Sequence, residues 1–161
     1  MSRLCVDHRF IVPVSFYLFG IQDTDEAALS SLFPDGAVSG GLVTVHPGRL
    51  DITTGVHTQY VKLRVQCWSD DPGPPEGAAW DDAASGTLAV PSGEMAVWEM
   101  MGRTPDSFLL PQGPGAYRFD AHCCGREQAR TLSRQKVTRI PREVEEITLR
   151  FWPGPDSGTA Q

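Results

Sequence analysis

Apolar and polar side chains alternate most clearly over residues 60–68. One side of this stretch is apolar and the other is polar, with Val61, Leu63, Val65 and Cys67 opposite Lys62, Arg64 and Gln66. Successive side chains of a strand point to opposite faces of a sheet, so this period of two predicts a half-buried strand. Residues 145–152 alternate in the same way before Pro153 and predict a last strand.

Shorter apolar runs, separated by turn residues, predict further strands. The run from Phe10 to Phe19 is β-branched and aromatic and ends at Gly20, which predicts a first strand. Two strands over 37–46 and 49–53, joined by His46-Pro-Gly, predict a hairpin. The remaining predicted elements are strands over 85–90, 95–101 and 107–110, and a second hairpin that turns at Pro111–Gly115 and returns over 116–123.

Three segments do not have the pattern of a strand. Residues 23–33 have acidic residues ahead of apolar ones and predict a short helix capped by Asp23 or Thr24. Residues 70–82, called the acidic loop below, are rich in Pro, Gly and Asp and predict an exposed loop. Residues 125–142 are basic and predict a mobile loop or a partly helical excursion.

Many short strands without long helices between them predict an all-β fold, an antiparallel two-sheet β-sandwich with one short helix and a long basic loop. A β-barrel is the alternative. A length of 161 residues suits one domain with a substantial core. We predict a single sandwich domain over residues 1–153 and a flexible C-terminal tail over residues 154–161.

The charge balance narrows the classes of partner. Twenty acidic and fourteen basic residues give a formal net charge of −6, which disfavours non-specific binding to nucleic acid or anionic lipid and favours a basic protein partner. The apolar run over residues 10–21 is too short to span a bilayer, and no secretion signal is apparent. We therefore expect a cytoplasmic protein with no membrane association.

The sequence contains no recognisable catalytic set. Its cysteines are Cys5, Cys67, Cys123 and Cys124, and they form no C-x-x-C pair. Adjacent cysteines on a strand point to opposite faces, which disfavours a zinc site. No G-x-S-x-G elbow and no phosphate-binding glycine motif is present. We expect no enzyme, no metal and no cofactor; a hydrolase would require Cys123 or Cys124 to meet a histidine in a cleft.

The acidic loop supplies the candidate binding residues. They are Asp70, Asp71, Glu76, Trp80, Asp81 and Asp82. Carboxylates can face a basic protein surface, and Trp80 is the large side chain expected to be an exposed contact. The alternative is a calcium- or small-ligand-binding sandwich, because carboxylate oxygens on loops are also what calcium prefers.

A family resemblance adds to this interpretation. Five segments within about residues 9–124 follow one another: Phe16-Tyr17-Leu18-Phe19-Gly20-Ile21-Gln22, Asp35-Gly36-Ala37-Val38-Ser39, Val61-Lys62-Leu63-Arg64-Val65, Gly86-Thr-Leu-Ala-Val-Pro and Phe108-Leu-Leu-Pro-Gln-Gly-Pro-Gly-Ala-Tyr-Arg-Phe. In this order they resemble the ComJ family, inhibitors of the DNA-entry nuclease of competent bacteria. The resemblance implies a small non-enzymatic protein that binds another protein, such as a nuclease. It assigns no active residue to this chain.

Overall fold

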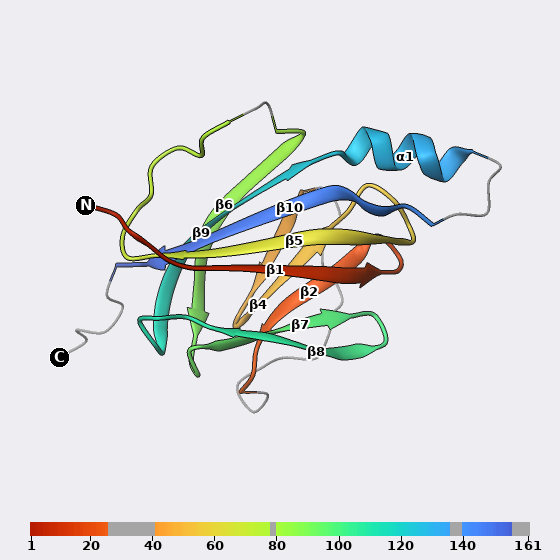
Figure 1. Cartoon of the computed structure of the whole chain (residues 1–161). Coiled ribbons are helices and arrows are strands. Elements are labelled where there is room, and N and C mark those ends of the chain that lie inside the picture. The colour runs from red at the N-terminus through yellow and green to blue at the C-terminus, as the bar shows by residue number, and fades with distance from the viewer. Residues whose placement is uncertain (26–40, 78–79, 136–139, 156–161) are drawn as a thin grey trace.

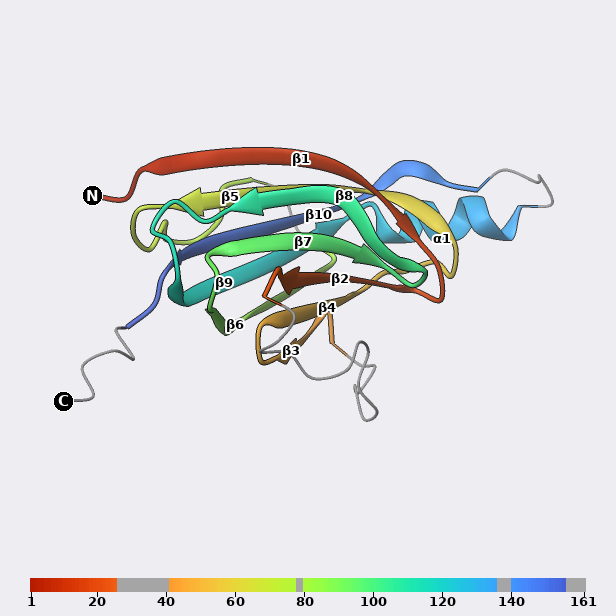
Figure 2. The same cartoon turned by 90° about the horizontal axis from the view of Figure 1, so that it is seen from below.

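A computed structural model describes residues 1–25, 41–77, 80–135 and 140–155. Over these residues two five-stranded sheets form two layers (Figure 1; Figure 2). The first sheet consists, in spatial order, of β1 (Leu4–Val14), β5 (Gln59–Trp68), β10 (Arg142–Pro153), β9 (Gly115–Cys124) and β6 (Asp82–Val90). The second consists of β3 (Val43–His46), β4 (Arg49–Thr53), β2 (Leu18–Asp23), β7 (Glu94–Glu99) and β8 (Gly102–Leu109). The predicted all-β sandwich is confirmed.

Antiparallel pairing dominates both sheets. Between the described strands the exception is β10, which runs parallel to β5 with Ile147 opposite Leu63. The strands predicted over 60–68 and 145–152 are therefore confirmed, and they are neighbours at the centre of the first sheet. A parallel neighbour requires a long connection, which the chain supplies through the four strands and the helix between β5 and β10.

The core lies between the two sheets, and the period of two is clearest in β5, which buries Val61, Leu63 and Val65. The rings of Phe119 on β9 and Phe151 on β10 have centroids 6.3 Å apart, and both side chains are fully buried. Phe19 and Ile21 on β2 belong to the same buried cluster, contributed by the opposite sheet. Fully burying side chains of this size contributes roughly 1.5–3 kcal/mol each, so the alternating apolar positions fix which face of each strand turns inward.

The run from Phe10 to Phe19 was predicted as one strand, and this prediction is wrong. β1 ends at Val14, a tight turn follows, and β2 begins at Leu18 in the other sheet. The break is hidden in the sequence because the two central turn residues, Phe16 and Tyr17, are aromatic rather than Gly or Asn. A prediction based on hydrophobicity alone therefore continues the strand through a turn.

The two predicted hairpins have different outcomes. β3 and β4 pair as expected through His46-Pro-Gly, although residues 37–40 of that prediction lie outside the described residues. The second hairpin is wrong, because β8 pairs with β7 and β9 pairs with β6, so the turn after Leu109 crosses between sheets. β8 also runs through Pro105, in the gap between the strands predicted over 95–101 and 107–110. An edge strand tolerates proline because its outward N–H groups need no partner.

The basic segment contains helix α1 (Arg126–Arg134), which joins β9 to β10. Figure 1 shows α1 beyond the end of β9, next to the connection between β4 and β5. No helix within the described ranges is long and apolar enough to cross a membrane. The short helix predicted over 23–33 lies outside the described residues from residue 26 onward, and the predicted tail is described only as far as Pro155.

Candidate functional site

The predicted acidic residues lie at two ends of the acidic loop. Asp70 and Asp71 follow β5, whereas Asp81 and Asp82 lead into β6 on the side of α1 (Figure 1). The side chains of Asp70, Asp71, Glu76 and Asp81 are exposed, and Asp82 is half-buried. The loop therefore divides the six candidate residues between two different environments.

Asp81 and Asp82 are already bound to α1. The backbone N–H of Arg126, the first residue of the helix, donates to Asp81 Oδ2 at 3.0 Å. The residue before it, Gly125, has no side chain to cap the helix, so Asp81 satisfies an otherwise open N–H from a distant segment. Asp82 Oδ2 lies 3.7 Å from Arg126 Nη1. These two carboxylates thus help to hold the helix in place.

Asp70 and Asp71 have no such partner. Each Oδ1 accepts a backbone N–H of its own loop, from Asp71 and Gly73 respectively, both at 2.8 Å. Among the described residues, no cationic side chain lies within 4.0 Å of Asp70, Asp71 or Glu76. Within the same ranges, no group of three or more His, Cys, Asp or Glu side chains is arranged to hold a metal ion. These carboxylates are free to face a basic surface.

Trp80 is half-buried and packs against the first sheet. Its ring centroid lies 5.1 Å from that of His122, with the planes tilted by 34°. A cavity of about 460 Å³ lies between the acidic loop and the sheet, walled by Trp68, Trp80 and three prolines of the loop. His122 lines it with both ring nitrogens buried and unbonded in the described structure, although Nε2 lies 3.3 Å from Asp120 Oδ1. Trp80 is thus only partly exposed, whereas the sequence predicted an exposed contact.

A buried ion pair, not foreseen from the sequence, ties α1 to the rest of the fold. The Glu145 carboxylate on β10 is fully buried. It accepts hydrogen bonds from Arg126 Nε at 3.1 Å, from Gln59 Nε2 at 2.6 Å and from the N–H of Gly55. Arg126 Nη2 also donates to the carbonyl of Thr53. The network joins the helix to the β4–β5 connection, and no spacing in the sequence relates these residues to one another.

The aromatic turn between β1 and β2 stands beside this connection. Phe16 and Tyr17 have φ angles of 56° and 65°, a left-handed conformation that is uncommon for large side chains. They remain 64% and 48% exposed, and both rings contact His57, with centroid distances of 4.8 and 5.4 Å. Backbone bonds fasten the turn, because the N–H of Tyr17 donates to His57 O and its carbonyl accepts the N–H of Thr54. Strain held by surrounding structure is a feature of binding sites.

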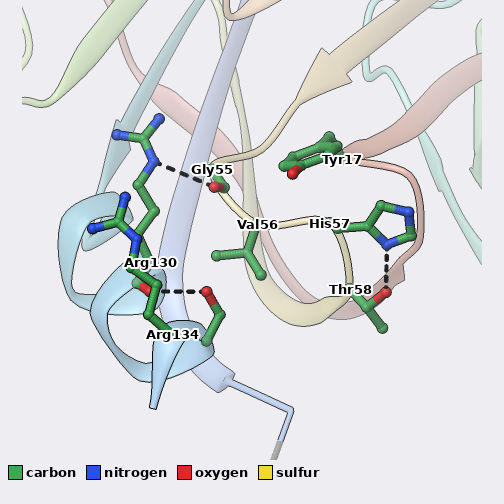
Figure 3. A pocket seen from close by; sticks show the side chains of 8 residues that line it. Tyr17, Gly55, Val56, His57, Thr58, Arg130 and Arg134 are labelled. Carbon is green, nitrogen blue, oxygen red and sulfur yellow. Dashed lines mark hydrogen bonds between the residues drawn. The ribbon is translucent and has the colours of Figure 1, made fainter. Parts of the chain in front are cut away.

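A pocket of about 600 Å³ lies between this turn and α1 and is called the arginine pocket below. Figure 3 shows Arg130 and Arg134 of α1 on one side and Tyr17 and His57 on the other, with Gly55 and Val56 between them. Arg130 Nε donates to the carbonyl of Gly55 at 3.3 Å, which fixes the helix side of the pocket. The sequence flagged the basic segment but gave no means of bringing it next to Tyr17.

Three of the four cysteines do not have the properties of nucleophiles. Burial raises the pKa of the Cys67 thiol to about 12 and that of the Cys123 thiol to about 11. The pKa of Cys124 is also raised, again mainly by burial. A catalytic thiol requires the opposite shift, because the thiolate is the reactive form. All four cysteines are free thiols.

No protein-family model and no curated protein sequence matches the chain. Two solved structures match its fold. ComJ from Bacillus subtilis, described as the inhibitor of the DNA-degrading activity of NucA, aligns with a TM-score of 0.62 at 12% identity, over 96% of this chain and 99% of ComJ. Crocagin biosynthetic gene J aligns with a TM-score of 0.60 at 16% identity, over 96% of this chain and 99% of that one. The resemblance to ComJ inferred from the sequence is thus found in the fold over nearly the whole of both chains.

Proposed function

We propose that this chain is a non-enzymatic protein-binding module that inhibits a nuclease, or binds another basic protein, in the cytoplasm. The observation that carries the proposal is the similarity in fold to ComJ, which extends over 96% of this chain and 99% of ComJ. The raised pKa values of the buried cysteines and the net charge of −6 are consistent with it.

The acidic loop is the proposed contact surface. A nuclease binds nucleic acid through a cationic cleft, and an acidic protein can occupy such a cleft with carboxylates in place of phosphates. Asp70, Asp71 and Glu76 suit this role because they are exposed and have no cationic partner in the described structure. Asp81 and Asp82 would contribute by shaping the end of the loop, since both already contact Arg126. Trp80 would stiffen the loop through its packing on His122.

The test is capture of a partner from host lysate by the wild-type chain and by a triple variant, Asp70→Asn/Asp71→Asn/Glu76→Gln. A matched control is Glu94→Gln/Glu99→Gln/Asp106→Asn, which removes the same charge from β7 and β8, where these side chains form no ion pair among the described residues. We expect a basic protein, identified by mass spectrometry, to be retained by the wild type and the control and lost by the triple variant.

The retained protein is then assayed for nuclease activity with and without the purified chain. Inhibition that weakens as salt rises supports the proposal, because opposite charges are screened by salt. Retention of the same partner by all three forms would contradict the proposal that the acidic loop is the contact surface. Absence of any retained protein would contradict the protein-binding function.

A second candidate function is small-ligand binding in the cavity beneath the acidic loop. The specific observation is the buried His122 ring, whose nitrogens have no hydrogen bond in the described structure. A ligand that binds only the folded protein raises its melting temperature. Calcium, bound by the carboxylates of the acidic loop, is the other ligand predicted from the sequence, and an unchanged melting temperature across millimolar calcium would reject it.

A further inference from the structure

We infer that the arginine pocket binds a small molecule carrying a phosphate group next to a planar ring, the chemistry of a nucleoside phosphate. This inference does not rest on the proposed nuclease partner, and the pocket lining shares no residue with the acidic loop. The inference starts from the lining, which contains hydrogen-bond donors and aromatic rings and no carboxylate. The lining is therefore basic, although the protein as a whole has a net charge of −6.

The phosphate half of the ligand is assigned to the α1 side. Arg130 and Arg134 lie four residues apart, so both side chains are on the same face of the helix. Figure 3 shows them together on one side of the pocket. Guanidinium groups bind phosphate oxygens through paired N–H donors, which makes arginine the usual residue for this recognition. The Arg130 bond to Gly55 O holds one of the two groups in position before any ligand arrives.

Glu127 lies beside both arginines. Its carboxylate lies 3.2 Å from Arg130 Nη1 and 4.0 Å from Arg134 Nη1, and it does not line the pocket. A phosphate would compete with this carboxylate for the same guanidinium groups. Removing the Glu127 charge should therefore strengthen anion binding, an effect that a merely structural role for the arginines would not produce.

The ring half of the ligand is assigned to the opposite side. Tyr17 is 48% exposed and lines the pocket beside His57. Their edge-to-face contact, with planes 76° apart, leaves a face of Tyr17 without that neighbour. Aromatic side chains stack on nucleic-acid bases without regard to base identity. A turn strained to hold two aromatic residues outward is consistent with this use.

The experiment is isothermal titration calorimetry of the full chain with adenosine monophosphate, adenosine and inorganic phosphate, all at one fixed ionic strength. We expect saturable binding of adenosine monophosphate that is about tenfold or more tighter than that of phosphate or adenosine. Arg134→Gln should weaken binding about tenfold; its side chain is 72% exposed, so the substitution should leave folding intact. Tyr17→Asn should reduce the affinity for adenosine monophosphate to that for phosphate, because asparagine accepts the left-handed backbone without offering a ring.

Two further variants test whether binding depends on this pocket or on the overall charge of the protein. Glu127→Gln should tighten binding of both adenosine monophosphate and phosphate. Arg103→Gln removes an exposed arginine on β8, which does not line the pocket, and should leave every affinity unchanged. Equal affinities for phosphate and adenosine monophosphate would overturn the assignment of the ring. The absence of saturable binding up to about 10 mM, or equal losses in Arg134→Gln and Arg103→Gln, would overturn the site.

Discussion

The acidic loop and the arginine pocket present opposite charges, and they differ in how those charges are held. The carboxylates of Asp70 and Asp71 accept backbone N–H groups of their own loop and have no cationic partner among the described residues. Arg130 is held by Gly55 and Glu127, contributed by the β4–β5 connection and by α1 itself. One surface is a projecting segment with free carboxylates, and the other is a pocket whose cations are partly positioned. The first suits a large basic partner and the second a small anion.

The difference shows why net charge describes this protein poorly. A formal charge of −6 predicts an acidic surface and says nothing of a basic pocket. The two regions meet at Arg126, whose backbone N–H is bound by Asp81 of the loop and whose side chain is bound by the buried Glu145. Both regions therefore depend on the position of α1. Substitutions around that helix can separate the contribution of each region to stability and to binding.

The largest expected effect is on stability, from Glu145→Ala. The substitution leaves the Arg126 guanidinium and the Gln59 amide without their buried partner, so we expect a loss of about 4 kcal/mol in the free energy of unfolding. Urea denaturation measures it. Glu146→Ala is the control, because Glu146 forms a partly exposed pair with Lys62 and should cost under about 1 kcal/mol. Similar losses in both variants would show that the Glu145 network does not anchor α1.

The next largest effect is expected from Gly125→Ala, at the start of α1. Gly125 has a φ of 75°, and an added Cβ would overlap the carbonyl oxygen of Val144. Gly113 has the same φ, with open space around the position of a Cβ. Gly113→Ala thus measures backbone strain alone, about 1 kcal/mol. Gly125→Ala should lose about 2 kcal/mol more and also weaken adenosine monophosphate binding. Equal losses by thermal or urea unfolding would contradict the close packing.

A smaller effect should divide the acidic loop into its two parts. Asp81→Ala removes a helix cap and should cost about 1 kcal/mol of stability, whereas Asp70→Ala, at an exposed position, should change stability by less than about 0.5 kcal/mol. Capture of the basic partner should show the reverse order, with Asp70→Ala losing more. If the two variants lose stability equally, Asp81 is not acting as the cap of α1.

The same residues show which features of the fold and of the acidic loop could be predicted from the sequence. Alternation identified β5 and β10 because the apolar positions of both strands, such as Leu63 and Ile147, alternate with polar ones and are buried. It failed at Phe16 and Tyr17, where aromatic residues occupy left-handed turn positions that usually carry Gly or Asn. The acidic residues were found by composition. Their separation into free and helix-bound groups could not be predicted, because Asp81 contacts Arg126, which lies 45 positions further along the chain. Contacts of that range follow from sheet order, which short-range patterns do not encode.

The smallest expected effect concerns Asp7, an exposed carboxylate that, unlike Asp70, has a cationic partner. The hydrogen bond from Arg64 lowers the pKa of Asp7 below its ordinary value of 3.8. A lowered pKa in the folded state means that the pair stabilises the protein above about pH 4, and that this contribution is lost as pH falls through the folded-state value. Asp7→Asn should therefore cost up to about 1 kcal/mol at pH 7 and nothing at the acid end of the transition. Asp70→Asn is the comparison variant, because Asp70 has no cation beside it in the described structure, and it should cost less than about 0.5 kcal/mol at pH 7. Urea unfolding of both variants between pH 7 and pH 3 makes the comparison. Parallel pH profiles would mean that the Asp7–Arg64 pair contributes no more to stability than an unpaired carboxylate of the acidic loop.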